Sequence, residues 1–259
     1  MSMPSPSSGE NKPRDADNWA RNVSSFQLSA VPRGAVNLNV EGRQAVGPLQ
    51  GFGPMWQKTY RVRLQGLGLS PTQVVKVWKE HFPEFWPKGN RFYGPLTGIA
   101  PGEVGLINMA LPGGVPLSTG VIVLYADDES FTFMTPQGHM FAGWITFSSH
   151  KMQECTVAQA QLLIRSNDPI YELGFRMGAS KSEDRFWEQT VVSLAHYLGS
   201  QDPQVETETI CVDRRVQWSQ VINIWQNAGV RTTLYMMATP VRVPFSWIRR
   251  RNGRDRLGG

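Results

Sequence analysis

The amino-acid sequence predicts an α+β fold in which a curved, seven-stranded antiparallel sheet wraps around a long C-terminal helix, with extensions at both ends of the chain. Three observations lead to this fold class. Six β-rich runs follow one another between Arg91 and Ser166, a strand and one or two helices precede them, and a long amphipathic helix follows them. The connections between the six runs are short, which favours antiparallel neighbours because a parallel crossover requires about a dozen residues.

The 259 residues divide into four parts by composition. Residues 1–25 are rich in Ser, Pro, Asn and charged side chains and are predicted to be disordered. Residues 26–55 contain short apolar pieces broken by Gly and Pro, which favours an extended arm lying on the body. Residues 56–199 carry the patterned elements of the fold, and residues 200–259 form a C-terminal extension with an amphipathic helix and an Arg-rich tail.

The patterned part begins with a strand and a helix. Tyr60, Val62 and Leu64 alternate with arginines, as in a strand that has one buried face. Ser70 and Gln73 have the spacing of a capping box at the start of "PTQVVKVWKEHF", in which apolar residues recur at helical intervals. A short second helix or turn is expected in "EFWPKGN", which follows directly.

The six β-rich runs share β-branched and aromatic residues and are separated by turn sequences such as "PGGVP" and "PQGH". They are residues 91–99, 104–111, 118–125, 130–135, 140–149 and 156–166. In the last run Ala158, Ala160, Leu162 and Ile164 are expected to face the helix. Arg165 belongs to the opposite, more polar face, where solvent is its expected surrounding.

The long helix is expected to begin at Ser180, with Glu183 completing a second capping box and Gly199 ending the helix. Its apolar stripe recurs at intervals of three and four residues and consists of Trp187, Val191, Leu194 and Leu198. This stripe must lie against another element, and the sheet is the only large candidate.

The order of strand, helices, six strands and long helix, with "SPTQVVKVWKEHFPEFWP" after the first strand and "KSEDRFWEQTVVSLAHYLG" at the end, resembles the helix-grip fold. This is the fold of the START, polyketide-cyclase and birch-pollen-allergen superfamily (SRPBCC). The resemblance covers just over half the chain. The turn "TPQGH" is similar to one in an uncharacterised bacterial branch of that superfamily. The resemblance implies a cavity between sheet and helix that holds an apolar ligand, as in lipid carriers, hormone receptors and aromatase/cyclases.

The residues expected to line or rim this cavity are large side chains on the strands and helices, each of which also suits an ordinary core. They are Trp78, Phe92, Tyr125, Phe133, His139, Trp144 and Trp187. His139 follows Gly138 in a short turn, which favours a turn or rim histidine over a buried catalyst. The leading hypothesis is therefore a non-enzymatic protein that binds a hydrophobic or amphipathic small molecule, such as a lipid, isoprenoid or polyketide.

An enzyme of cyclase or hydrolase type, with His139 or Glu154 as acid or base in the same cavity, is a less favoured alternative. No nucleophile elbow, Walker-type phosphate loop or dinucleotide fingerprint occurs. Cys155, Cys211 and the four scattered histidines give no metal-ligand spacing, so neither a metal nor a cofactor is expected. The sequence also lacks the h-region of a signal peptide and any run of 18 apolar residues, which favours a cytoplasmic protein.

The positive charge is concentrated at the C-terminus. Residues 242–259 hold six arginines against Asp255, a net charge of +5, which equals the net charge of the whole chain. The folded body therefore lacks the basic footprint of a nucleic-acid-binding protein. Two interpretations of the tail remain open. It binds an anionic membrane surface or a protein partner through Arg249, Arg250 and Arg251, or it is a solvated end without a partner.

The rest of the C-terminal extension combines an acidic linker after Gly199 with a second amphipathic helix. The apolar stripe of this helix is Trp218, Val221, Ile222 and Trp225, and Gly229 is its expected stop. The residues beyond it either dock on a membrane or form an arm packed on the body or on a second subunit. Pro240 and Pro244 favour the arm because they interrupt a continuous helix. A structural or assembly protein that binds through its arms and tail is thus the second alternative.

Overall fold

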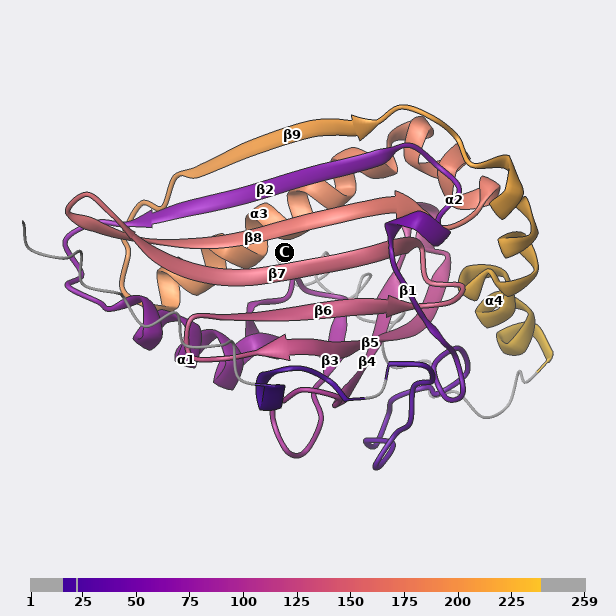
Figure 1. Ribbon diagram of the computed structural model, residues 1–259, viewed down its shortest axis with the longest axis horizontal. Coiled ribbons are helices and arrows are strands. Elements are labelled where there is room, and N and C mark those ends of the chain that lie inside the picture. The colour runs from indigo at the N-terminus through magenta and orange to yellow at the C-terminus, as the bar shows by residue number, and fades with distance from the viewer. Residues whose placement is uncertain (1–15, 22, 239–259) are drawn as a thin grey trace, which may run out of the picture.

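A computed structural model describes residues 16–21 and 23–238 of the chain. Its centre is a nine-stranded antiparallel sheet in the order β3-β4-β5-β6-β7-β8-β2-β9, with β1 paired to β6 (Figure 1). The strands are β1 Ala45–Val46, β2 Met55–Leu64, β3 Arg91–Tyr93, β4 Val104–Ala110, β5 Pro116–Ala126, β6 Ser130–Pro136, β7 Phe141–Met152, β8 Cys155–Ser166 and β9 Val205–Asp213. Of residues 1–25, predicted to be disordered, residues 1–15 and 22 lie outside the described residues, as does the predicted Arg-rich tail. The rest of that segment is described and includes the 3-10 helix Ala16–Asn18 and a bridge from Trp19 to Tyr125.

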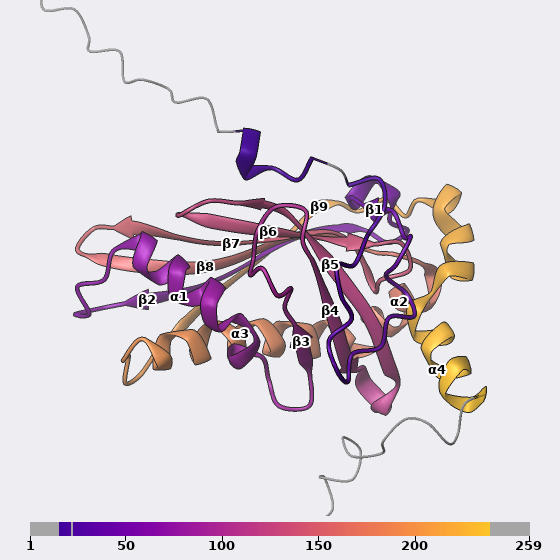
Figure 2. The same cartoon turned by 90° about the horizontal axis from the view of Figure 1, so that it is seen from below.

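Some helices cover one face of this sheet, and others lie at one of its ends (Figures 1 and 2). They are η1 Ala16–Asn18, η2 Pro48–Gln50, α1 Pro71–His81, η3 Phe82–Phe85, η4 Pro112–Gly114, α2 Pro169–Gly174, the π-helical turn η5 Phe175–Ala179, α3 Ser180–Tyr197, η6 Trp218–Gln226 and α4 Ala228–Ala238. Figures 1 and 2 place α1 and α3 on that face, and α2, η6 and α4 at that end. Figure 2 also shows the N-terminal arm on the opposite face. This arrangement confirms the predicted α+β, helix-grip class, with β1 and β9 added to the expected seven strands.

The first helix forms as the sequence predicts. The Ser70 hydroxyl accepts a hydrogen bond from the Gln73 amide at 3.2 Å, and the Gln73 side chain accepts one from the Ser70 amide at 2.8 Å. Two of the amide groups that every helix leaves without partners at its start are thereby satisfied. The helix buries Val74, Val75 and Trp78 against the sheet.

Two hydrophobic cores lie on the two faces of the sheet. The larger one, between the sheet and the helices, includes Ala158, Ala160, Leu162 and Ile164, as predicted. The smaller one lies beneath the N-terminal arm, where Phe26 and other buried side chains pack against β4 and β5. The arm therefore covers the second apolar face that an antiparallel sheet with helices on one side leaves exposed.

The long helix α3 begins at Ser180, as predicted, but no side chain caps its start, so the predicted capping box is wrong. The side chain of Asp168 caps the separate helix α2 by accepting from the amides of Ile170 and Tyr171, and the non-helical Gly178, with φ +116°, interrupts the path from α2 to α3. The Glu183 side chain is free to point to the sheet instead, where it binds Lys58.

The acidic linker after Gly199 is also a wrong prediction, because it forms strand β9 along the edge of β2 (Figure 1). Glu206 pairs with Arg63 at 2.8 Å and Glu208 pairs with Arg61 at 3.1 Å. These opposite charges stand on neighbouring strands, which favours the pairing. The acidic residues of this segment are thus strand residues matched to the arginines of β2.

The second amphipathic helix differs from its prediction as well. Residues Trp218–Gln226 form the 3-10 helix η6, and α4 follows with Gly229 buried in its first turn. The Gly229 amide donates to the Tyr171 hydroxyl at 2.8 Å, and a Cβ on Gly229 would lie 3.3 Å from that oxygen. Gly229 is therefore needed for a close approach between α4 and α2, not for a helix stop.

Arg165 is buried, although solvent was its expected surrounding. Its guanidinium donates to the Gly53 and Arg215 carbonyls, the latter at 2.7 Å, and pairs with Asp213 at 2.6 Å. One side chain thus joins the sheet to the N-terminal arm and to the C-terminal extension. The burial of Arg165 has no local sequence signal, because its hydrogen-bond partners Arg215 and Gly53 stand about 50 and about 110 residues away in the chain.

Candidate functional site

Four of the seven expected cavity residues meet between the sheet and the helices. Trp78, Phe92, Phe133 and Trp187 belong to one aromatic cluster, with Phe82 at its centre. Ring centroids lie 5.6 Å apart for Phe92 and Phe133 and 4.9 Å apart for Phe82 and Phe92. Such distances correspond to packed aromatic pairs. In the described part of the chain these rings occupy the space in which the cavity was expected.

The other three expected residues lie elsewhere. Tyr125 faces the arm side of the sheet, where its ring lies 4.8 Å from that of Trp19, because a register irregularity falls between Val123 and Tyr125. Trp144 is half-buried on the same side, next to Gly47. His139 lies in the turn between β6 and β7. The structure therefore does not bring the seven side chains around one cavity.

His139 is sealed in its turn. Its Nδ1 accepts from the Phe141 amide at 3.0 Å, and burial lowers the pKa of the ring to about 4. The preceding Gly138 has φ +84°, and its carbonyl accepts from the Ala228 amide at 2.9 Å. A neutral ring thus stabilises the turn beneath the C-terminal extension. Glu154, the other candidate acid or base, is exposed at the far end of the β7–β8 hairpin.

A buried charged cluster lies on the helix side of the sheet, and the sequence analysis did not identify it. Lys58, whose side chain is 2% exposed, donates to Glu183, to Asp184 Oδ1 at 2.7 Å and to Ser180 Oγ at 3.3 Å. Tyr60 donates to the same Asp184 oxygen at 2.7 Å. We call these five residues the Lys58 cluster.

The signal for the Lys58 cluster was present in two patterns. Lys58 shares the inward face of its strand with Tyr60 and Val62, and Glu183 stands one helical turn before Trp187 on the apolar stripe. A charged residue in phase with a buried face on each of two elements predicts an interior ion pair. The capping-box spacing of Glu183 concealed this alternative.

Burial dominates the electrostatics of the Lys58 cluster. It raises the pKa of the Glu183 carboxyl to about 7, although the positive charge of Lys58 opposes the shift. Burial and the neighbouring carboxylates also raise the pKa of Tyr60, so this phenol keeps its proton. The cluster therefore combines two hydrogen-bond donors, Lys58 and Tyr60, with a Glu183 carboxyl that exchanges its proton near neutral pH.

The Lys58 cluster adjoins an irregular helical turn. The π-helical residues Phe175–Ala179 separate α2 from α3, and Gly178 has φ +116°. The Phe175 ring lies 5.1 Å from Lys58 Nζ. The indole nitrogens of Trp78 and Trp86 are buried on the helix side without a hydrogen-bond partner among the described residues. Such turns, and such unpartnered groups, are concentrated at functional sites.

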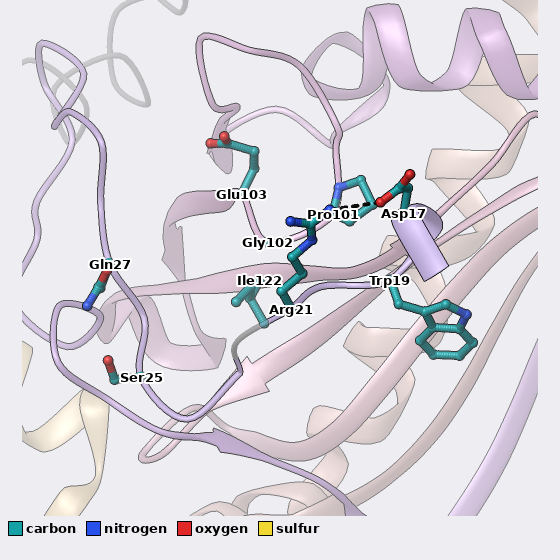
Figure 3. A pocket seen from close by; sticks show the side chains of 9 residues that line it. All are labelled: Asp17, Trp19, Arg21, Ser25, Gln27, Pro101, Gly102, Glu103 and Ile122. Atoms are coloured by element: carbon teal, nitrogen blue, oxygen red, sulfur yellow. Dashed lines mark hydrogen bonds and ion pairs between the residues drawn. The ribbon is translucent and has the colours of Figure 1, made fainter. Parts of the chain in front are cut away.

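Two surface pockets of the described residues lie away from this interior. One, of about 350 Å³, is on the arm side of the sheet between η1 and the turn before β4 (Figure 3). Asp17 and Arg21 on its rim pair with each other at 2.8 Å, and both are exposed. The second, of about 220 Å³, lies at the β7–β8 hairpin beside Glu154 and Cys155. Neither contains a buried acid, base or nucleophile.

Residues 16–21 and 23–238 contain neither a metal-binding cluster nor a membrane-spanning helix. No three His, Cys, Asp or Glu side chains gather there in a way that would hold a metal ion. No helix in these residues has both the length and the apolar content that crossing a bilayer requires. Cys155 and Cys211 are both free thiols.

Comparisons with known proteins find similarity in fold. No family model matches the sequence, and no curated protein matches it. A START superfamily protein from Mycobacterium smegmatis is 17% identical, with 58% of this chain and 100% of that chain covered at a TM-score of 0.38. The di-domain ARO/CYC StfQ from the steffimycin biosynthetic pathway is 9% identical, with 56% of this chain and 51% of that chain covered at a TM-score of 0.43. Ara h 8.0201 is 9% identical, with 57% of this chain and 99% of that chain covered at a TM-score of 0.39.

Proposed function

We propose that the chain binds a hydrophobic or amphipathic small molecule, such as a lipid, isoprenoid or polyketide-like compound, between the sheet and the long helix. The observation that carries the proposal is the Lys58 cluster, a set of charged side chains in the interior where the rest of the lining is apolar. Ligand sites in proteins have this composition, with an apolar lining and a few polar groups that orient the ligand.

The Lys58 cluster is not explained by stability. Removing a lysine and a carboxylate from water costs several kcal/mol per ion, and apolar residues of similar volume are often as stabilising as a buried ion pair. The Glu183 carboxyl shows this cost directly, because burial raises its pKa in spite of Lys58. A cluster that the fold does not need for stability is a candidate for recognition.

The chemistry of the Lys58 cluster selects the polar group of the ligand. Lys58 and Tyr60 donate hydrogen bonds, whereas Glu183 and Asp184 accept them. A hydroxyl or carbonyl group satisfies this mixture, because it accepts from the lysine and, as a hydroxyl, donates to a carboxylate. A ligand carboxylate would face two protein carboxylates with one lysine between them. We therefore expect an uncharged polar group on an apolar body.

Binding requires side chains to move. Phe175 and Trp187, both half-buried, lie beside the Lys58 cluster, and their rings fill the space that an apolar body would occupy. The π-helical turn at Phe175–Ala179 is the irregular point at which α2 and α3 join. Displacement of the Phe175 ring at that turn, together with a rotation of the Trp187 side chain on α3, opens the interior without breaking the sheet.

The test is native mass spectrometry of protein purified without detergent, followed by organic extraction and identification of the bound compound. A reproducible added mass of a few hundred daltons supports the proposal. A neutral fluorescent probe, Nile red, is then titrated into the wild type, Lys58→Met and the control Arg63→Met, whose charge lies in an exposed ion pair. The amount of co-purified ligand is also compared among these three proteins by native mass spectrometry. The proposal requires that Lys58→Met changes this amount and that Arg63→Met does not. An apo mass together with no binding of Nile red would refute it.

A further inference from the structure

One end of the molecule carries a large exposed apolar surface that the interior site does not use. We call it the end surface. It is formed by α2 with η5, by η6 and by α4, which lie together in both views (Figures 1 and 2). Its exposed side chains are Ile170, Leu173, Met177, Trp218, Val221, Ile222, Trp225, Val230, Leu234, Tyr235 and Met237. Scattered apolar side chains are normal on a surface, but their concentration on adjoining elements at one end of the molecule (Figures 1 and 2) indicates an interaction site.

The three elements are joined to the body by polar contacts. Asn223 of η6 donates to the Gln50 and Asn167 carbonyls at 2.8 and 2.9 Å. Asn227 donates to the buried Asp168 carboxylate at 2.8 Å, directly before α4. Trp225, between these two asparagines, is 80% exposed. Two asparagines of the extension thus face the protein while the large apolar side chains of η6 are exposed, the reverse of a helix that completes a core.

The charge of this part of the chain is strongly positive. Residues 214–259 contain nine arginines and one acidic residue, Asp255, a net charge of +8, so residues 1–213 sum to −3. Arg214, Arg215 and Arg231 are exposed on the described part of the extension. Arg249, Arg250 and Arg251 follow in sequence and lie outside the described residues. Apolar side chains and arginines are therefore supplied by the same segment.

We propose that the end surface docks the protein on an anionic lipid bilayer. Trp218 and Trp225 suit the interfacial layer, since tryptophan places an apolar ring in lipid and its N–H in the wet headgroup region. The arginines complement anionic headgroups. A nucleic acid would leave the exposed leucine, isoleucine and methionine side chains without apolar partners. This proposal is independent of the small-molecule site.

The experiment measures sedimentation of the full-length chain with vesicles. Vesicles of phosphatidylcholine are compared with vesicles in which about a third of the lipid is phosphatidylglycerol. The test variants are Ile222→Ser, Trp225→Ser and the double variant, because these side chains are 66% and 80% exposed and contribute little to folding. The matched control is Leu96→Ser, which removes a side chain that is 86% exposed in the loop after β3. A thermal melt verifies that all variants fold.

We expect binding to phosphatidylglycerol vesicles that falls by at least about tenfold in the double variant and stays unchanged in the control. Replacing Arg249, Arg250 and Arg251 with Gln, or raising the salt from about 0.1 M to 1 M, should weaken binding as the charges are screened. Equal binding of the double variant and the wild type would overturn the proposal. So would the absence of binding to anionic vesicles. Self-association abolished by Ile222→Ser and Trp225→Ser, without vesicle binding, would assign the end surface to a second copy.

Discussion

The raised pKa of Glu183 predicts an unusual dependence of stability on pH. In the folded protein burial holds this pKa at about 7, against the ordinary value of 4.5. Below about pH 4.5 the carboxyl is protonated in both states and makes no difference. Between about pH 4.5 and pH 7 the unfolded chain loses the Glu183 proton while the folded protein keeps it. The free energy of unfolding therefore falls with increasing pH, and the fall is complete above about pH 7.

The size of this fall follows from the two pKa values. At about 1.4 kcal/mol per pH unit, the interval from 4.5 to about 7 corresponds to about 3 kcal/mol. Glu183→Gln removes the titrating group while keeping its volume. The difference in unfolding free energy between wild type and Glu183→Gln should thus decline by about 3 kcal/mol from about pH 4 to about pH 8.

The assay is urea unfolding at a series of pH values, followed by circular dichroism. Because other groups titrate in the same window, the comparison uses the difference between the two proteins and not either curve alone. Glu80→Gln, which changes an exposed glutamate of α1, is the control and should give a difference that stays flat. A difference that rises with pH for Glu183→Gln would refute the reasoning. It would mean that attraction to Lys58 outweighs the cost of burial and that the Lys58 cluster is an ordinary stabilising ion pair.

Two further predictions concern the attachment of the C-terminal extension. Arg165→Met leaves the Gly53 and Arg215 carbonyls without its guanidinium and removes one of the two arginines that pair with Asp213, so it should cost about 1–3 kcal/mol, with faster cleavage of the extension in limited proteolysis; unchanged cleavage would contradict the role assigned to Arg165. Gly138→Ala would place a Cβ 2.0 Å from the Gln226 carbonyl oxygen at φ +84°, whereas Gly42→Ala meets no atom within 4 Å at φ +73°. Both strain the backbone by about 1 kcal/mol, and thermal melts should show a clearly larger loss for Gly138→Ala because only there must η6 also shift.

The sequence predicted the elements whose signals are local. The capping residues of α1 lie three positions apart, and the inward residues of β8 alternate, so both could be identified from neighbouring letters. The same locality explains the failures. Glu183 has the spacing of a capping residue, but its side chain binds Lys58 on the sheet and no side chain caps α3. Local spacing cannot show that a distant strand offers Glu183 a partner.

The sequence indicates which aromatic side chains lie in the interior, but it does not indicate whether they surround a cavity or fill it. Trp78, Phe92, Phe133 and Trp187 lie on the helix side of the sheet, and an aromatic ring that lines a cavity and one that fills it have the same sequence pattern. The choice depends on how closely the sheet and helices approach, which involves residues far apart in the chain. Lys58 and Arg165 were missed for a related reason, because their partners stand on distant elements.

The two proposed sites meet at one turn of helix. Met177, which is 79% exposed, belongs to the end surface, while Phe175, two residues earlier in the same π-helical turn, lies over Lys58. A bilayer that binds the end surface therefore contacts the segment that must move for a ligand to reach the interior. The Gly178 conformation at φ +116° separates this turn from the regular hydrogen bonding of α3. Exchange of an apolar ligand at a lipid surface needs this combination, because the ligand then passes between two apolar environments without crossing water.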